Sequence, residues 1–421
     1  MKRKKLFISL TAILSFIIAL SIFLGVWYLG DRYEVFEKDF TKEFEIPGLR
    51  EGAVPQGMGN CELSYNLKDE NGNTVSNGQQ YFFISAYMTD GSPSRIYVTG
   101  GDTGYVGYVT MKNTDGTDYT GHCGGIAANN NGSTVWVTGE GTVYVARSSE
   151  NKDNDYTNTA TEIIEKAQGK IKDENGNVDR AINFTASFDA NCNADFCYYY
   201  DDPRYVSLSY DKLYVGEFYR KGAYETDGAH RVTTPNGYKN YAFMYEYAVN
   251  SDATSKYGLT TLSTTNATNL NEEVPRIYSI FSIPEKVQGM AVAGNNILLS
   301  QSYGLANSAI TVFDKNKAMS KSDKYKELKG KDFAYKSVYI TAGGKQIQYY
   351  DSTELKVYYL DCNDKEMLKQ TYSIPSMSEG LCTVSTANSS RVYVLFESAS
   401  KKYKTFVREQ LSNVYSVRIK N

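Results

Sequence analysis

Residue types that commonly carry catalysis or bind metals are scarce in this sequence. Only two histidines occur, His122 and His230, and no two cysteines have the Cys-x-x-Cys spacing of a zinc site. The sequence also lacks a Gly-x-Ser-x-Gly elbow, a Walker loop and a His-Glu-x-x-His motif. No metal site is predicted, and the sequence identifies no cofactor.

Positive charge is also limited. The net charge is −3, but Lys2, Arg3, Lys4 and Lys5 contribute +4, so the rest of the chain carries −7. A nucleic-acid-binding surface requires clustered Lys and Arg, and the composition implies no such surface. We therefore expect no nucleic-acid partner.

Proline is rare, with 8 residues, whereas the chain has 37 Tyr and 18 Phe. Aromatic residues favour β-strands, and Gly, Asn and Asp supply the turns between them. With 421 residues, the chain is long enough for one large domain or for two to three smaller ones. The composition therefore favours an all-β fold.

Residues 6–30 form a run without charge, directly after the basic residues 1–5. As a helix this run would be about 37 Å long, at roughly 1.5 Å per residue, against a hydrocarbon core of about 30 Å. Basic residues on its N-terminal side predict a cytoplasmic N-terminus and an extracellular C-terminal part. We expect a single-pass signal anchor at the cell membrane, followed by a stalk at 31–41. A cleaved signal peptide is the alternative.

A phrase repeated at long intervals is the main indication of architecture. An aromatic strand ends in Ile-Pro or Val-Pro, and a Gln-Gly or Glu-Gly pair with an apolar residue follows. The copies lead to Gln56-Gly57-Met58, Gln288-Gly289-Met290 and Glu379-Gly380-Leu381. Such spacing, with strand-like runs after each copy, is typical of a β-propeller built from repeated blades.

The strand-like runs after each copy fall into five sets, which predict five blades over residues 42–421. The sets are 81–87, 95–98 and 105–111; 134–138, 142–147 and 181–184; 212–219, 241–249 and 276–283; 296–302, 309–314 and 369–374; and 391–397 with 413–419. The fifth set lacks an outer strand, and residues 42–47 form a strand without a blade. Pairing these two closes the ring, which removes exposed sheet edges. Six blades are the alternative.

Two inserts and the cysteines give further expectations. Residues 158–167 predict a short helix, and the repeated segments 68–73 and 172–177 predict Asn-Gly hairpin turns. Six cysteines lie in the part expected outside the cytoplasm, where disulfides are permitted. Cys192 and Cys197 are the pair expected first.

The repeated phrase also predicts a ring of residues around the propeller axis. Its members are Gln56, Gly124, Ser187, Gln288 and Glu379, with His122 close by. The glycines have an architectural explanation as well, because inner strands crowd near the axis. A second polar set at the ends of the following strands comprises Glu140, Glu217, Gln301 and Glu397, and His230 lies in the loop after Glu217. Paired carboxylates and an accessible histidine are groups that serve acid–base chemistry.

These motifs resemble a group of secreted or membrane-anchored bacterial β-propeller proteins without an assigned activity. The resemblance covers about residues 42–419 and rests on the repeated phrase together with 121–126, 186–188, 215–219 and 395–398. A more distant likeness is to calcium-dependent propellers of the gluconolactonase type. That family uses Glu, Asn and Asp on the axis, and this sequence does not reproduce the set.

Three functions are consistent with these features. The first is binding of a small polar ligand or surface glycan at the axial mouth through Gln56, Ser187, Gln288, Gln301, Glu397 and His230. The second is hydrolysis of a glycoside, lactone or ester by Glu379 with Glu217 or Glu397, and with His122 as acid, base or positioning group. The third is a scaffold for protein partners. We expect the first, and the sequence gives neither the ligand nor the oligomeric state.

Overall fold

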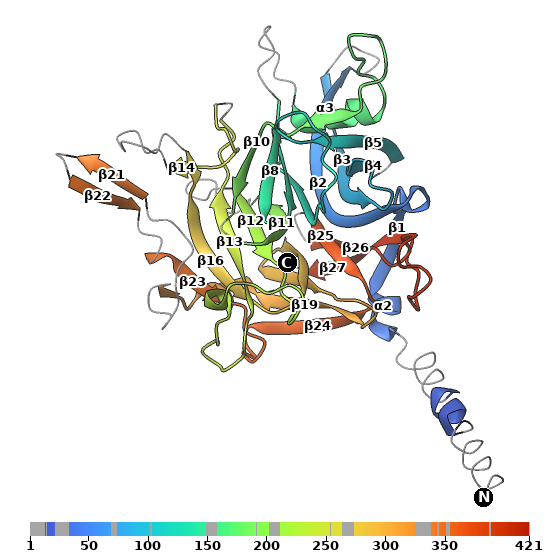
Figure 1. The fold of residues 1–421 in the computed structure, drawn as a ribbon, viewed down its shortest axis with the longest axis vertical. Helices are drawn as coiled ribbons and strands as arrows, with labels where there is room; N and C mark the ends of the chain where they lie inside the picture. The colour runs from blue at the N-terminus through green and yellow to red at the C-terminus, as the bar shows by residue number, and fades with distance from the viewer. Residues whose placement is uncertain are drawn as a thin grey trace, which may run out of the picture.

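The computed structural model describes most of the chain downstream of Tyr33. The described residues are 13, 15–21, 33–68, 74–101, 103–148, 158–190, 192–201, 211–252, 254–262, 273–324, 338–342, 345–350, 354–386 and 389–420. Over these residues the chain forms an all-β propeller of five blades (Figure 1). The predicted all-β, five-bladed propeller is therefore confirmed.

Each blade is a sheet whose first strand lies nearest the axis. Blade one contains β2 (Ala53–Lys68), β3 (Thr74–Met88), β4 (Arg95–Gly100), β5 (Gly104–Lys112) and β9 (Ala181–Asn183). Blade two contains β6 (Gly125–Ala128), β7 (Thr134–Gly139), β8 (Thr142–Arg147) and β10 (Ala186–Asp189). Blade three contains β11 (Ala194–Tyr200), β12 (Lys212–Glu217), β13 (Ala242–Ala248), β16 (Ile277–Ile283), β23 (Lys356–Tyr359) and β20 (Asp323–Lys324).

Blades four and five have four strands each. Blade four contains β17 (Val287–Ala293), β18 (Asn296–Gln301), β19 (Ser308–Asp314) and β24 (Leu368–Ile374). Blade five contains β25 (Ser378–Ser385), β26 (Ser389–Phe396), β27 (Asn413–Lys420) and β1 (Phe40–Glu45). Two hairpins lie outside the blades, β14 (Thr261–Leu262) with β15 (Val274–Pro275) and β21 (Val338–Ala342) with β22 (Lys345–Tyr350). Besides the helical residues 15–21, the described part of the chain contains helices α2 (Glu34–Asp39), α3 (Thr159–Ala167) and α4 (Lys315–Met319) and short 3₁₀ helices at Leu49–Glu51 and Gly228–His230.

The N-terminal strand closes the ring, as the sequence predicted. β1 pairs antiparallel with β27, and Lys42 lies opposite Tyr415. Phe82 of β3 packs between Phe44 of β1 and Tyr393 of β26, with its ring centroid 4.8 Å from each. These buried aromatic contacts join blade five to blade one, and the neighbouring inner strands also touch around the whole axis. The ring is thus closed by the pairing of β1 with β27 and by contacts between neighbouring inner strands.

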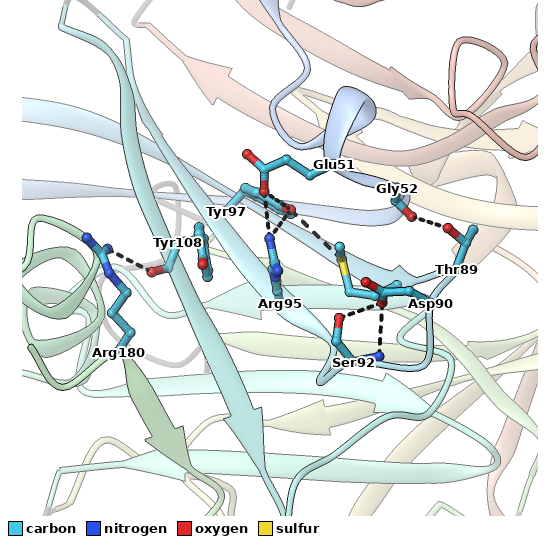
Figure 2. A network of polar contacts seen from close by, with 10 residues as sticks. Glu51, Gly52, Thr89, Asp90, Ser92, Arg95, Tyr97, Tyr108 and Arg180 are labelled. Atoms are coloured by element: carbon cyan, nitrogen blue, oxygen red, sulfur yellow. Dashed lines mark hydrogen bonds and ion pairs between the residues drawn. The ribbon is translucent and has the colours of Figure 1, made fainter.

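A polar network fixes the crossing from β1 to β2 (Figure 2). Arg95 donates to Glu51 at 2.6 Å and to the Tyr97 hydroxyl at 3.2 Å. Gly48 has a φ of +77° and lies so close to the Tyr97 ring that a Cβ would be 2.3 Å from it. Only glycine fits this turn, which directs the chain from the outer strand of blade five to the inner strand of blade one.

Two strand assignments from the sequence are wrong. Residues 181–184 were expected in blade two, but β9 pairs in parallel with β5 at the outer edge of blade one. Ser187 was expected on an inner strand, but it lies on β10, the outermost strand of blade two, opposite Tyr144. The inner strand of blade three is β11, where Asp195-Phe196-Cys197 stands in place of the Gln-Gly-Met pattern.

Several local predictions are confirmed. Asn158 caps α3 by accepting from the Thr161 backbone N–H, and Ile163 and Ile164 are buried. Gly176 has a φ of +82° in the turn closed by the bond from Asp173 N to Asn177 O. The corresponding turn at residues 69–73 lies outside the described residues.

The expected disulfide is wrong. All six cysteines lie in the described part of the chain and none is paired. Cys197 sits on β11 with its thiol toward the carbonyl of Trp136, 3.8 Å away. It therefore serves as a small packing residue between blades two and three.

The predicted anchor falls mainly on residues that are not described. In the described ranges, no helix is both long and apolar enough to cross a bilayer. The anchor at 6–30 therefore stays a prediction.

Candidate functional site

Glycines bring the inner strands into direct backbone contact around the axis. A Cβ on Gly57 would lie 2.6 Å from the Gly125 Cα, and one on Gly125 would lie 2.3 Å from the Cys197 backbone N. A Cβ on Gly380 would lie 2.5 Å from the Met58 backbone N, and one on Gly289 would lie 2.9 Å from the Gly380 Cα. Because a Cβ does not fit at these four positions, the inner strands of blades one, two, four and five make close backbone contacts there, and these contacts separate the two ends of the axis. The architectural explanation of these glycines is thus correct.

The division explains the repeated phrase. The apolar residue after each glycine, Met58, Met290 or Leu381, is buried in the core between blades. The polar residue before each glycine lies at the start of an inner strand, on one face of the propeller. We call this face, which carries Gln56, Glu379 and Glu397, the glutamate face. We call the opposite face, where inner strands turn into second strands, the hairpin face.

Gln56, Glu379 and Glu397 form one cluster at the glutamate face. Gln56 Nε2 donates to Glu397 Oε2 at 2.8 Å, and the Glu379 and Glu397 carboxyl groups hydrogen-bond to each other. Gln56 and Glu379 are only 5% and 3% exposed. The structure thus brings together three of the predicted site residues from β2, β25 and the end of β26.

Burial changes the proton affinity of the two carboxyl groups. It raises the pKa of Glu379 well above its ordinary value, and the charge of Glu397 adds to this effect. Burial also raises the pKa of Glu397 to about 7, against the opposing effects of the Gln56 hydrogen bond and the Lys402 charge. Ionising both carboxyl groups would place two negative charges in contact, which is unfavourable. The pair therefore retains a proton near neutral pH.

Three side chains from different blades surround this cluster. Lys402, in the loop after β26, donates to the Tyr87 hydroxyl at 2.7 Å. The His122 ring lies 5.1 Å from the Tyr87 ring. His122 is reached by solvent, but the protein surrounds its ring on most sides, and this burial together with the Lys402 charge lowers the pKa of His122 to about 4. His122 is therefore a neutral imidazole at pH 7.

Glu217 and His230 form a separate buried pair in blade three. Glu217 accepts from the Phe243 backbone N–H at 2.8 Å, and its carboxylate lies 2.9 Å from His230 Nδ1. Both side chains are 2% exposed, and the His230 ring stacks on Phe243. His230 Nε2 has no hydrogen-bond partner among the described residues. The pair holds the Gly228–His230 turn onto the sheet, so the predicted role of Glu217 beside Glu379 finds no support in its contacts.

The remaining predicted residues are dispersed. Ser187 is exposed at the outer edge of blade two, far in the strand order from the inner ring. Gln301 donates to the Glu285 carbonyl at 3.1 Å and accepts from Thr311 at 2.7 Å. Gln288 is half-buried at the start of β17, as predicted. Glu140 is exposed in the turn after β7.

Asp195 takes the place in the inner ring that was assigned to Ser187. Its carboxylate accepts from the Phe218 backbone N–H at 2.8 Å. Burial raises the pKa of Asp195 to about 7, and the Glu217 charge contributes in the same direction. The sequence did not reveal it because the third inner strand lacks the glycine of the repeated phrase.

A cavity of about 760 Å³ lies at the hairpin face, beyond the glycines. All five inner strands contribute to its wall. The polar lining residues are Asn60, Glu62, Gln80, Asn130, Tyr198, Tyr199, Tyr200, Asp201, Asn295, Thr383, Ser385, Thr386 and Ser390. No Lys, Arg or His belongs to the described lining. Sequence reasoning missed this cavity, because the ends of the inner strands share no motif.

Hydrogen bonds fix several of these lining side chains. Asn60 Nδ2 donates to the Thr383 carbonyl at 3.2 Å, and the Tyr198 hydroxyl donates to the Val292 carbonyl at 3.4 Å. Lys315 donates to the Tyr200 hydroxyl at 3.1 Å, and its ammonium lies 4.7 Å from the centre of that ring. The wall is thus preorganised and joins blades one, three, four and five.

Neither end of the axis gathers a metal-ligand set from the described residues, since no group of three His, Cys, Asp or Glu side chains has suitable geometry. Glu379 and Glu397 form a pair of interacting carboxyl groups, and each has a raised pKa because of burial. The side chains at the two ends of the axis can form hydrogen bonds, and the carboxyl groups can also exchange protons.

Comparisons with known proteins give little beyond this geometry. No known family model matches the chain. No curated protein matches it either. Among solved structures, the chain is similar to one titled "Structure of Dos1 propeller", with 8% identity and a TM-score of 0.27, over 86% of this chain and 73% of that chain. A likeness at that level adds nothing to the fold assignment, which follows from the strand order.

Proposed function

We propose that the chain is a membrane-attached propeller that binds a small, neutral, hydroxyl-rich molecule in the cavity at its hairpin face. A saccharide is the ligand class that fits best. The observation that carries this proposal is the cavity itself, with a volume of about 760 Å³ and walls from all five inner strands. Ligand sites in proteins typically measure about 300–1,000 Å³.

The chemistry of the wall supports a neutral ligand. Amides from Asn60, Gln80 and Asn295 and hydroxyls from Ser385 and Ser390 offer both donors and acceptors. Three consecutive tyrosines, 198–200, add aromatic surface with polar tips. Since Glu62 and Asp201 are the charged residues of the described lining, an anionic ligand would meet repulsion.

Binding is a better match than hydrolysis for the carboxyl groups on the glutamate face. Glycosidases keep their two carboxyl groups about 5–9.5 Å apart so that the sugar and water fit between them. Glu379 and Glu397 instead hydrogen-bond to each other, and Glu217 is engaged by His230 and the Phe243 N–H. Neither arrangement leaves a space between two carboxyl groups.

Membrane attachment rests on the uncharged run at 6–30 and the four basic residues before it. With the propeller outside the cell, the ligand would come from the medium or the cell wall. A test of attachment is alkaline extraction of membranes, which leaves an anchored chain in the pellet.

The ligand proposal is tested by isothermal calorimetry of the full-length chain against neutral, cationic and anionic saccharides. Ser385 is an exposed residue of the cavity wall, so Ser385→Trp fills the opening without disturbing the core. Exposed Ser251, in the loop after β13, provides the matched control Ser251→Trp. We expect binding by the wild type and the control and none by Ser385→Trp. Equal saccharide binding by the wild type, Ser385→Trp and Ser251→Trp would refute the cavity as the binding site. Binding of protein partners without binding of any saccharide would favour a scaffold function.

A further inference from the structure

Strands β2 and β3 continue past the rest of blade one at the hairpin face. Tyr81 is the last residue of β3 that pairs with β4. Beyond it, among the described strands, the segments 62–68 and 74–80 pair only with each other. We call these two paired segments the arm. In blades two, four and five, by contrast, the third strand pairs with the second strand up to the hairpin. At about 3.4 Å per residue, the arm is about 20 Å long.

The base of the arm is part of the cavity wall. Asn60, Glu62 and Gln80 all line the cavity, and Glu62 lies opposite Gln80 in the ladder. Asn60 is also fixed to blade five by its bond to the Thr383 carbonyl at 3.2 Å. The arm therefore begins inside the proposed binding site and extends outward from it.

One face of the arm continues the polar lining of the cavity. Alternate residues of a strand share a face, and in β2 every second residue outward from Asn60 is polar. These residues are Asn60, Glu62, Ser64, Asn66 and Lys68. A Cβ on Gly78, an exposed residue of β3, would meet Glu62 Oε1, so Gly78 shares this face. The other face begins with Leu63, which is buried in the core between blades one and two.

Blade five supplies a polar rim beside the arm. Its hairpin between β25 and β26 contributes hydroxyl groups to the cavity wall, and those of Ser385 and Ser390 hydrogen-bond to each other at 3.0 Å. The Asn60–Thr383 bond joins the inner strands of blades one and five. Glu62 and Ser385 each follow this bond by two residues, and both line the cavity. The opening therefore lies between two polar walls, and the arm prolongs one of them.

We propose that the cavity holds the end of a linear, neutral oligosaccharide and that the polar face of the arm binds the sugar units that follow. This inference rests on the saccharide binding proposed above. A single sugar ring would contact only the cavity, whereas a chain presents hydroxyl groups along its length to a polar surface that leads outward. The residues of this face in β2 include one acid, Glu62, and one base, Lys68, so the face favours neither an anionic nor a cationic chain.

The test compares short and long saccharides by isothermal calorimetry on the full-length chain. The probes are cellobiose and cellohexaose, together with chitobiose and chitohexaose. We expect the hexamer of at least one series to bind about tenfold more tightly than its dimer, which corresponds to about 1.4 kcal/mol. Contacts between the arm and the additional sugar units account for this gain.

Shortening the arm should remove the gain. Replacing residues 64–78 with Asn-Gly leaves Leu63 opposite Gln79 and joins them by a two-residue turn. The removed segment makes no pair with β4, so the blade keeps its own ladder. We expect unchanged binding of the dimer and hexamer binding reduced to that of the dimer.

Two point variants test the same claim without a deletion. Gly78→Val places a side chain on the polar face, and valine suits a strand. Gln79→Val is the matched control, because the neighbouring residue belongs to the opposite face. We expect Gly78→Val to weaken binding of the hexamer several-fold and to leave that of the dimer, and Gln79→Val to change neither.

The outcomes separate this inference from the proposed function. Equal affinity for dimer and hexamer in the wild type overturns the arm as a binding surface and leaves the cavity as the site. A preference for the hexamer that survives both the shortened arm and Gly78→Val also overturns the arm. Absence of binding by all four probes counts against saccharide binding itself.

Discussion

Replacing Glu397 with glutamine should make the stability of this protein less sensitive to pH. In the folded chain Glu397 and Glu379 share a proton, and burial raises the pKa of Glu397 to about 7 from an ordinary value of 4.5. The folded state therefore binds more protons than the unfolded state between these pH values. Stability contributed by this group is complete below about pH 4.5 and is lost as pH rises toward 7.

The size of the effect follows from the shift. A rise of about 2.5 units, at about 1.4 kcal/mol per unit, corresponds to about 3 kcal/mol of stability lost between pH 4.5 and 7. Glutamine is neutral at every pH, still accepts from Gln56 and can donate to Glu379. Glu397→Gln should therefore exceed the wild-type free energy of unfolding by about 1 kcal/mol or less at pH 5 and by about 3 kcal/mol at pH 8.

The assay is urea unfolding of the full-length chain at several pH values from 5 to 8, with the difference between variant and wild type plotted against pH. Asp195, whose pKa is also raised to about 7, titrates in both proteins and cancels in the difference. Glu409→Gln is the control, because that carboxylate is 45% exposed on the same loop region. A difference that stays constant with pH, or a variant that is weaker at pH 5, would refute the shared proton.

Further predictions concern packing and pairing. Gly57→Ala should cost about 1–3 kcal/mol in urea unfolding, because the new methyl would meet the Gly125 backbone at 2.6 Å; unchanged stability would mean that the inner strands are not in contact. His230→Phe should cost about 1–3 kcal/mol in urea unfolding, because the buried Glu217 carboxyl group loses its hydrogen-bond partner at 2.9 Å and keeps only the Phe243 N–H. Glu217→Gln in that background should recover part of the loss, and an unchanged stability would contradict the buried pair. Titration of thiols in denaturant without reductant should find six free cysteines. A count of four would show that the chain contains a disulfide, which would contradict the structure.

The sequence predicted the positions of strands correctly where the backbone geometry admits only one residue type. Inner strands β2, β17 and β25 were found through Gly57, Gly289 and Gly380, because backbone contact at the axis admits no Cβ. Ring closure was predicted from two unmatched strands, and β1 does pair with β27. Strand β11 was missed because Asp195-Phe196-Cys197 reaches the ring without the glycine.

The site was harder to predict than the fold. Gln56, Glu379 and Glu397 do converge, but their mutual hydrogen bonds depend on side-chain direction, which a strand pattern does not give. Glu217 shares its strand position with Glu397 yet turns to His230, which comes from the following loop. The cavity depends on where five hairpins end, and no local motif specifies that.

The most direct test of the account is an experimental structure of the chain with a bound neutral saccharide. The account predicts ligand density between the ends of the five inner strands, within hydrogen-bonding distance of Asn60 and Ser385. Density among Gln56, Glu379 and His122 on the opposite face would contradict it.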